Sequence, residues 1–407
     1  MGEGKTEEKS GKQVLIGLTV SHMSQHFFQG ASIVYRNMQV DLGLTYTQIG
    51  LMTGVINTLG GFLQMVYSIA GRRFSRRILL GGSNILMGLG CFVTGVADRF
   101  AIVLGGSAVS GAGQAGQHPV STSILAEKYD RKRGVGTALS LFFGLGYVGN
   151  IISPILLSTV ALLYGWRSSY FLLTFLPVGT GLLIILSLRG EPAGDKAVSE
   201  ETGRNLIQDI RSSFKVRGAI SILIAWSIVS GGTGLGVMTT WVPVFLRDPV
   251  KGLGMSVFWA GVLSSVATIG GVLGTIYLGR VADRRGYLKT AMGSLAVTTV
   301  AICLLTFYAS FNFLLIPNLF ILSMTTFSLT SLLQAHLTSV SSKAERDVLI
   351  GLFWTTGSGV SSLWSTMLGF LIDRYSFNAV WLTMASGGAV AVLFLYNALR
   401  GMETERI

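Results

Sequence analysis

Long runs of apolar residues alternate with short polar segments along the whole chain. A helix needs about 20 apolar residues to cross a hydrocarbon core of about 30 Å, and the runs have this length. Some of them, such as 78–97 and 172–188, contain no charged residue. We therefore predict an all-α membrane protein with twelve transmembrane helices, roughly at residues 14–36, 46–70, 78–97, 101–126, 134–164, 168–189, 219–246, 256–282, 289–309, 311–340, 347–374 and 378–400.

The basic residues gather in alternate loops between these predicted helices. If both termini are cytoplasmic, the inner segments hold 25 of the 31 Lys and Arg residues, which is the asymmetry that sets membrane orientation. We therefore predict a multi-pass protein of the inner (cytoplasmic) membrane with both termini in the cytoplasm. The same loops account for most of the net charge of +12, so the charge does not indicate a nucleic-acid partner.

The chain divides near its middle. Residues 190–218 form a predicted cytoplasmic linker, in which Leu206, Ile207, Ile210 and Phe214 suit one face of a short amphipathic helix. Residues 1–189 and 219–407 are the predicted N-terminal and C-terminal six-helix bundles. A shift of 211 residues brings Gly50 onto Gly261 and Arg73 onto Arg284. Duplicated halves of this kind indicate a transporter with pseudo-symmetric bundles around a central site.

Two motifs resemble a known family. The stretch GRVADRRGYLK (279–289) is similar to the loop motif of the major facilitator superfamily, and GLGYVGNIISP (144–154) resembles its fifth-helix signature of glycine and proline. More narrowly, SHMSQHFFQG (21–30) and GQHPVSTS (116–123) resemble the fosmidomycin-resistance branch. The resemblance implies secondary active transport of a small polar or anionic organic molecule by alternating access, with export favoured. It also implies that helices 1, 4, 7 and 10 line the central cavity.

The predicted membrane interior contains no carboxylate. All 19 Asp and Glu residues fall in tails, loops or helix ends. In the branch that the chain resembles, acidic residues stand where this sequence has His26 and Val120. Carboxylates are the usual proton relays of ion-coupled transporters, so proton coupling here would depend on histidine, whose ordinary pKa is about 6.5.

Polar residues form a stripe on each of two predicted cavity-lining helices. At about 100° per residue, one side of helix 1 collects His22, Gln25, His26, Gln29 and Arg36 within an arc of about 100°. One side of helix 4 collects Gln114, Gln117 and His118. Unsatisfied polar groups are too costly to face lipid, so we predict that these residues bind the substrate.

Helices 7 and 10 contribute fewer polar candidates. We predict substrate contacts from Trp226 and Thr233 on helix 7 and from Thr326, Thr330 and Gln334 on helix 10. Ser and Thr hydroxyls also bond to their own helix, so a structural role is the alternative for these positions. His336 falls on the leucine side of helix 10, which indicates packing or a gate.

Three interpretations of the interior histidines remain open. They bind an organic substrate and a coupling proton, they hold helices 1 and 4 together, or they bind a transition metal through His22, His26 and His118. The metal transporter is the second choice, because no interior carboxylate or thiolate balances a divalent ion, and we predict no metal site. A ligand receptor without transport activity is a further alternative.

The loop motif also predicts inner gating contacts. In the superfamily resembled, the Asp of this motif meets a helix N-terminus of the opposite half and holds the inner side closed. Asp283, next to Arg284, would then face Arg133 and its basic neighbours. In the first half, Arg72 replaces the acidic residue, so Arg72 and Arg73 would face Glu345 or Asp347. The charge swap would restore attraction across the interface.

Catalytic motifs are missing. No P-loop, HExxH or GxSxG sequence stands in a suitable context, and GAGQAGQ (111–117) belongs to a membrane helix rather than to a nucleotide-binding turn. We therefore predict that the chain is not an enzyme, needs no cofactor and acts as a monomer. Its predicted partners are the lipid bilayer and a small molecule.

Overall fold

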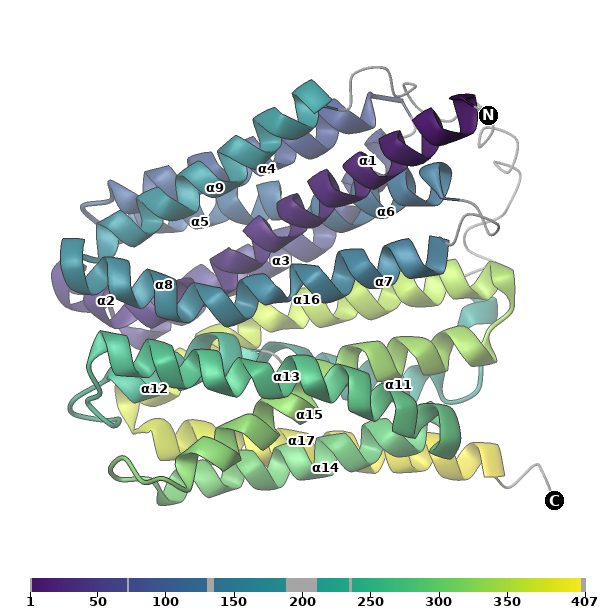
Figure 1. Cartoon of the computed structure of the whole chain (residues 1–407). Helices are drawn as coiled ribbons and strands as arrows, with labels where there is room; N and C mark the ends of the chain where they lie inside the picture. Colours follow the sequence, from purple (N-terminus) through teal and green to yellow (C-terminus); the bar gives the residue numbers. More distant parts are fainter. Residues whose placement is uncertain (1, 72, 130–134, 188–210, 234–235, 404–407) are drawn as a thin grey trace. The chain divides into compact units, whose positions relative to one another are not determined.

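The computed structural model describes residues 2–71, 73–129, 135–187, 211–233 and 236–403. The regular structure in these ranges is helical throughout (Figure 1). Within the described ranges, each of the twelve predicted spans falls on helix, and several spans consist of two or more consecutive helical segments. The predicted linker falls largely on residues 188–210, which lie outside the described ranges, so the amphipathic helix expected there stays a prediction.

The first half of the chain builds six spans. The first consists of α1 (Gly2–Phe27), the 3₁₀ helix η1 (Phe28–Val34) and α2 (Tyr35–Leu42). The others are α3 (Tyr46–Ala70), α4 (Arg76–Gly95), α5 (Phe100–Gln114) with α6 (Gln117–Lys128), α7 (Val135–Gly146) with α8 (Val148–Tyr164), and α9 (Trp166–Ser187). Pro119 lies in the first turn of α6, where its missing N–H costs little, so the helix restarts just before it.

The second half follows a similar order. Its first span contains α11 (Ala219–Ile228), the π-helices η3 (Val229–Thr233) and η4 (Val237–Trp241), and α12 (Val242–Arg247). The remaining spans are α13 (Val257–Arg285), α14 (Tyr287–Leu304) with η5 (Leu305–Phe307), α15 (Leu315–Val340), α16 (Lys343–Arg374) and α17 (Phe377–Glu403). Both π turns fall in the segment predicted as helix 7.

Eight helical segments of the described chain are long and apolar enough to cross a membrane on their own. The predicted spans at 14–36, 101–126, 219–246 and 347–374 are not among them. Three of these are interrupted by 3₁₀ turns, by π turns or by the break before α6. The fourth, α16, is rich in glycine, serine and threonine, which lowers its hydropathy.

Contacts divide the chain into two compact units. One contains residues up to 37 together with 55–200, and the other contains 38–54 together with the residues from 201 onward. The first turns of α3 therefore group with the second half of the chain.

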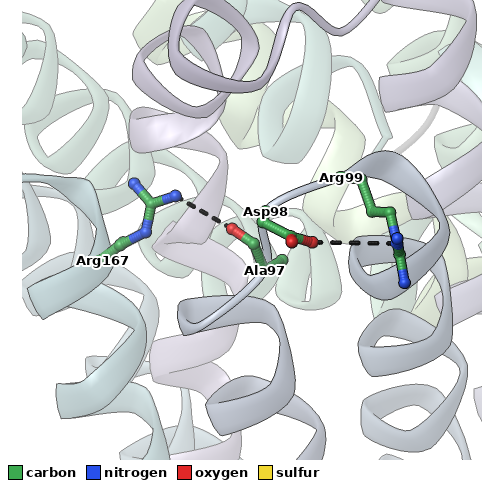
Figure 2. Close-up of polar contacts among 4 residues, drawn as sticks. All are labelled: Ala97, Asp98, Arg99 and Arg167. Carbon is green, nitrogen blue, oxygen red and sulfur yellow. Dashed lines mark hydrogen bonds and ion pairs between the residues drawn. The ribbon is translucent and has the colours of Figure 1, made fainter.

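The first unit has its own apolar core. Leu18 of α1, Leu80 of α4, Leu125 of α6 and Phe142 of α7 are fully buried in one cluster. At one end of this unit, the Arg167 guanidinium of α9 donates a 3.0 Å hydrogen bond to the Ala97 carbonyl oxygen just after α4, as Figure 2 shows. It thereby satisfies a carbonyl group at the end of α4. The neighbouring Asp98 and Arg99 lie 3.9 Å apart and are exposed, so their ion pair adds little.

The second unit packs around aromatic and aliphatic side chains of α11, α14, α15, α16 and α17. Trp226 stacks on Phe353 with ring centroids 4.3 Å apart. His336 is buried on α15, as are Leu332 and Leu333 of the same helix, and its role in packing or in a gate stays a prediction. This core is mainly apolar.

A carboxylate fixes the start of α3 in the second unit. The backbone N–H groups of Tyr46 and Thr47 donate to Asp373 at 2.9 and 2.7 Å, and the Thr47 hydroxyl donates at 2.6 Å. The first N–H groups of a helix have no partner within it, so a carboxylate from α16 satisfies them. A Cβ atom on Gly50 would overlap with the Ser365 carbonyl, which shows how closely α3 and α16 approach.

Candidate functional site

His22 and His26 of α1 form a hydrogen-bonded pair at membrane depth in the first unit. Their Nε2 atoms lie 3.0 Å apart. The Nδ1 atom of His22 lies 3.0 Å from the Phe142 carbonyl oxygen of α7, and that of His26 lies 3.1 Å from the Asn150 amide oxygen of α8. The pair is thus attached to two other helices, as expected for polar groups that avoid lipid.

Aromatic rings and glycines shape the surroundings of the pair. The Phe142 ring stacks on His22 with centroids 4.3 Å apart, and the Tyr147 ring lies 4.9 Å from His26. A Cβ atom on Gly146 would overlap with the His22 imidazole, and one on Gly149 would overlap with the Met23 carbonyl. The absence of side chains at these two glycines therefore lets α7 and α8 approach α1.

His118 brings α6 to the same place. Its ring centroid lies 5.1 Å from that of His22, and the two rings meet edge to face. Its Nδ1 atom is buried and has no hydrogen-bond partner. His22 is fully buried, whereas His26 and His118 are half-buried. The structure therefore brings together the three histidines that the sequence singled out.

Glutamines on α1 and α6 hold the helices around this cluster. Gln25 donates a 2.7 Å hydrogen bond to the Gln114 carbonyl oxygen. Ser21 donates to the Gln117 amide oxygen at 2.9 Å and accepts from Asn84 of α4 at 2.6 Å. Gln25 and Gln117 are almost fully buried. Both amides thus serve to connect helices in this structure.

Gln29 and Arg36 lie beyond the point where the first span stops being α-helical. Gln29 is half-buried in η1, and Arg36 is half-buried in α2. The stripe was expected on an unbroken α-helix, whereas the 3₁₀ segment η1 interrupts the span between His26 and Arg36. Substrate contact by Gln29 and Arg36 stays a prediction.

The candidates of the second unit occupy different settings. Thr326 donates to the Leu322 carbonyl of its own helix at 2.9 Å. The Trp226 indole N–H is buried without a partner beside Phe353. Thr330 and Gln334 are half-buried on α15, and Thr233 ends η3. Substrate contact by these residues stays a prediction.

The predicted gating residues lie at helix ends. Arg72 and Arg133 fall outside the described residues, and Asp347 is described only as part of α16. Arg73 and Arg284 are exposed, and Asp283 accepts a 2.9 Å hydrogen bond from the Tyr287 hydroxyl. The predicted pairings between the two halves stay predictions.

The start of α16 has a capping box. The Ser342 hydroxyl accepts from the Glu345 N–H, and the Glu345 carboxylate accepts from the Ser342 N–H. Hydrogen bonds from the Ser342 side chain and backbone lower the pKa of Glu345 below its ordinary value. These groups fix the first turn of this helix.

The described residues contain no group of three or more His, Cys, Asp or Glu side chains placed to hold a metal ion. The three histidines meet mainly through ring contacts, and two of the four nitrogens in the His22–His26 pair already face protein oxygens. Cys91 is buried beside Ser110, apart from the histidines. The geometry therefore does not support the metal interpretation.

A cavity of about 340 Å³ lies in the second unit between α11 and α16. Its lining is mostly aliphatic and aromatic, including Leu223, Leu352 and Trp364. Because the lining offers few polar groups, this cavity does not suit a polar substrate.

The sequence did not single out Phe142 and Asn150, which contact the histidines, or Ser21 and Asn84, which connect α1 with α6 and α4. Asn150 had a detectable signal, because it is a polar residue inside the glycine signature at 144–154. The contact of Phe142 uses its carbonyl group, so its side-chain type gave no indication.

Comparisons with known proteins identify relatives over most of the chain. A family model described as the Major Facilitator Superfamily matches residues 14–366, with a second match at 250–405. The sialic acid transporter NanX of Escherichia coli is 22% identical over 281 residues, covering 68% of this chain and 65% of that protein, just under two thirds of its length. The probable sulfoacetate transporter SauU of Cupriavidus necator is 24% identical over 386 residues, covering 87% and 86%. Among solved structures, a mutant of the nucleoside transporter NupG has a TM-score of 0.78 at 16% identity and covers 95% of this chain and 99% of that one.

Proposed function

The chain belongs to the major facilitator superfamily, and from this premise we propose that it is a secondary transporter that moves a small organic anion across the cytoplasmic membrane by alternating access. The predicted superfamily, the all-α membrane fold and the prediction that the chain is not an enzyme are confirmed by the match and by the structural likeness. The direction of transport is not part of this match. The resemblance to the fosmidomycin-resistance branch, which favours export, stays a prediction.

The proposed substrate class follows from two kinds of support. Relatives are named as transporters of sialic acid and of sulfoacetate, which are organic anions. In this chain, the helices at the site carry imidazole and amide groups at membrane depth, and the predicted interior has no carboxylate that would repel an anion. A carboxylate or sulfonate group is therefore a suitable partner for the site.

The single observation that carries this proposal is the unpartnered Nδ1 atom of His118 beside the His22–His26 pair. A buried polar atom without a hydrogen bond costs about 1–3 kcal/mol. An anionic oxygen that accepts from Nδ1–H would remove this cost and orient the substrate. His26 is half-buried in the same cluster and adds a second group that can respond to a negative charge.

Uptake into proteoliposomes tests the function. We expect saturable uptake of labelled sialic acid or sulfoacetate that is accelerated by the same anion on the opposite side, and little uptake of a neutral sugar. His118→Ala should reduce the rate at least tenfold, because it removes the unpartnered imidazole. Ser123→Ala on the same helix is the matched control, since the Ser123 hydroxyl bonds to its own helix at the Pro119 carbonyl, 2.8 Å away.

Other outcomes would redirect the proposal. Saturable binding of an anion without flux would favour the receptor alternative. Transport of neutral solutes alone would show that the anionic substrate class is wrong. An unchanged rate in His118→Ala would place the binding site elsewhere.

A further inference from the structure

The hydrogen bonds around His22 and His26 determine how many protons the two rings hold for each orientation of the Asn150 amide. The Phe142 carbonyl oxygen can only accept, so His22 Nδ1, 3.0 Å away, carries a hydrogen. The Asn150 amide oxygen also only accepts, so His26 Nδ1, 3.1 Å away, carries another. The two Nε2 atoms lie 3.0 Å apart and need one hydrogen between them. Two neutral imidazoles have one N–H each, so this arrangement contains one extra proton.

Half a turn of the Asn150 amide gives a neutral arrangement with the same partners. The amide nitrogen then donates to His26 Nδ1, which keeps its lone pair. His26 Nε2–H still donates to His22 Nε2, and His22 Nδ1–H still donates to Phe142. All the bonds are kept in both states, and only the hydrogen at His26 Nδ1 differs. A second added proton would place a hydrogen on both Nε2 atoms and break the bond between the rings.

The described surroundings of the pair contain no fixed counter-charge. The titratable groups facing the pair are His118 of α6 and Tyr147 before α8. Helices α7 and α8 contain no Asp, Glu, Lys or Arg. On the other helices packed on α1, charged residues stand near the helix ends: Glu127 and Lys128 on α6, and Arg167 on α9. On α1 itself, the charged residues Glu3, Lys5, Glu7, Glu8, Lys9 and Lys12 all precede His22 by at least ten residues. An unbalanced charge at this depth is costly, so the neutral state is favoured near neutral pH, and without an anion the pair takes up its proton only in a more acidic medium.

We infer that His22, His26 and Asn150 form a binding site for a single proton, which is taken up at His26 Nδ1 as the Asn150 amide turns. Only the identity of the balancing anion rests on the proposed function. Binding of the proton and of the anion must then favour each other by the same factor, because linkage between two ligands is reciprocal. Charge can pass from His26 to the more buried His22 by movement of the shared Nε2 hydrogen.

Nitrogen NMR on histidine-labelled protein in lipid nanodiscs tests the proton count without any substrate. The chain has four histidines, and single His→Gln variants assign their signals. Between about pH 4.5 and 9, we expect the His22–His26 pair to gain one proton in total, with a hydrogen shared between the Nε2 atoms. Gain of two protons, or of none over this range, would overturn the inference.

Variants of Asn150 test the role of the amide. In Asn150→Asp, a carboxylate that only accepts should keep the pair protonated to at least one pH unit higher than in the wild type. Asn150→Leu offers neither a donor nor an acceptor, so the pair should lose its extra proton at a lower pH than in the wild type. The matched control on α8 is Ser158→Ala, because the Ser158 hydroxyl bonds to the Ile155 carbonyl of its own helix at 2.9 Å. Equal titration in Asn150→Asp and wild type would contradict the inference.

Calorimetry with sulfoacetate in buffers of different ionisation enthalpy measures how many protons are taken up when the anion binds. Near neutral pH we expect about one proton to be taken up for each anion bound, and close to none in Asn150→Asp. Binding of the anion with no proton uptake in the wild type would contradict the linkage. If neither sulfoacetate nor sialic acid binds, the proposed substrate class is wrong, and the NMR proton count still decides whether the proton site exists.

Discussion

The polar side chains next to the histidines of the first unit and those along α11 and α15 of the second unit are satisfied in different ways. In the first unit, Ser21, Asn84 and Gln117 connect α1, α4 and α6 through side-chain hydrogen bonds. In the second unit, the hydroxyl groups of Ser227, Thr326 and Ser328 donate to carbonyl groups four residues earlier in their own helices. The first arrangement depends on the packing of several helices, whereas the second would persist in an isolated helix.

This difference separates polar residues by what they can do. A hydroxyl that bonds to its own helix has already satisfied its donor and offers little to a ligand. An imidazole or amide that bridges helices holds a geometry that a substrate or a proton can alter. Bridges between helices also occur in the second unit, as between Thr298 and Thr325 at 2.7 Å and from the Asn318 amide to the Ala301 carbonyl oxygen at 3.2 Å, but these hydroxyl and amide groups do not titrate near neutral pH.

Among variants that test this difference between the units, Gly146→Ala should have the largest effect on transport and stability. The added methyl group would overlap with the His22 imidazole, so the histidine pair and α7 cannot both keep their positions. We expect transport in proteoliposomes to fall more than tenfold and the melting temperature to drop by several degrees. Gly144→Ala is the matched control, because nothing lies within 4 Å of a Cβ atom there. Equal activity of the two variants would show that the packing on His22 is unimportant.

Ser21→Ala should have the next largest effect, on stability. It leaves the Asn84 amide and the Gln117 oxygen without their partner, and a bridging hydrogen bond within a membrane protein contributes about 0.6–2 kcal/mol. Thermal unfolding in detergent should therefore occur a few degrees lower than in the wild type. Ser227→Ala, which removes a hydroxyl bonded to its own helix, should change it by less than one degree. Equal shifts of the unfolding temperature in Ser21→Ala and Ser227→Ala would contradict this difference between the two kinds of hydrogen bond.

Asp373→Asn tests a strongly polar contact that links α3 and α16 in the second unit. The amide keeps the geometry of the side chain but loses the charge that favours the N–H groups of Tyr46 and Thr47. We expect hydrogen exchange at the start of α3 to become several-fold faster. Asp98→Asn, at an exposed position in the first unit, serves as the control and should leave exchange there unchanged.

Ser342→Ala should have the smallest effect. Loss of a serine cap typically costs about 1 kcal/mol, so hydrogen exchange in the first turn of α16 should quicken about fivefold at pH 7. The pKa of Glu345 is lowered in the folded state, so its contribution is present above its ordinary pKa and is lost as the pH falls through the lowered value. The variant should therefore differ less from the wild type at acidic pH. If the exchange rates of the variant and the wild type differ by the same factor at neutral and acidic pH, the serine cap acts independently of the Glu345 carboxylate.

The sequence predicted the fold better than it predicted the site, for physical reasons. Apolar runs set the twelve spans because the hydrocarbon core sets the length of a helix. The 3₁₀ segment η1 and the π turns near Val229 and Val237 depend on packing, and no single residue type predicts them. The prediction of a continuous polar stripe from His22 to Arg36 assumed an ideal α-helix, because the interruption by η1 could not be predicted.

The three histidines could be grouped from sequence because His22 and His26 stand one turn apart and His118 lies in a similar polar stripe. Their partners could not, because Asn150 comes from α8, 124 residues after His26. A helical pattern gives the face of one helix and does not say which residue of another helix lies opposite. The roles of Gln25 and Gln117 as bridges between helices were likewise set by packing alone.

The charge-free helices around the histidine pair have an electrical consequence. Helices α7 and α8 carry no fixed charge. If these helices move within the membrane while no substrate or proton is bound, their movement would transfer little charge across the transmembrane voltage. A proton bound together with a monovalent anion is neutral and would cross without electrical work. A divalent anion with one proton would carry one negative charge, so its flux, unlike that of a monovalent anion, would follow the transmembrane potential at about 2.3 kcal/mol per 100 mV.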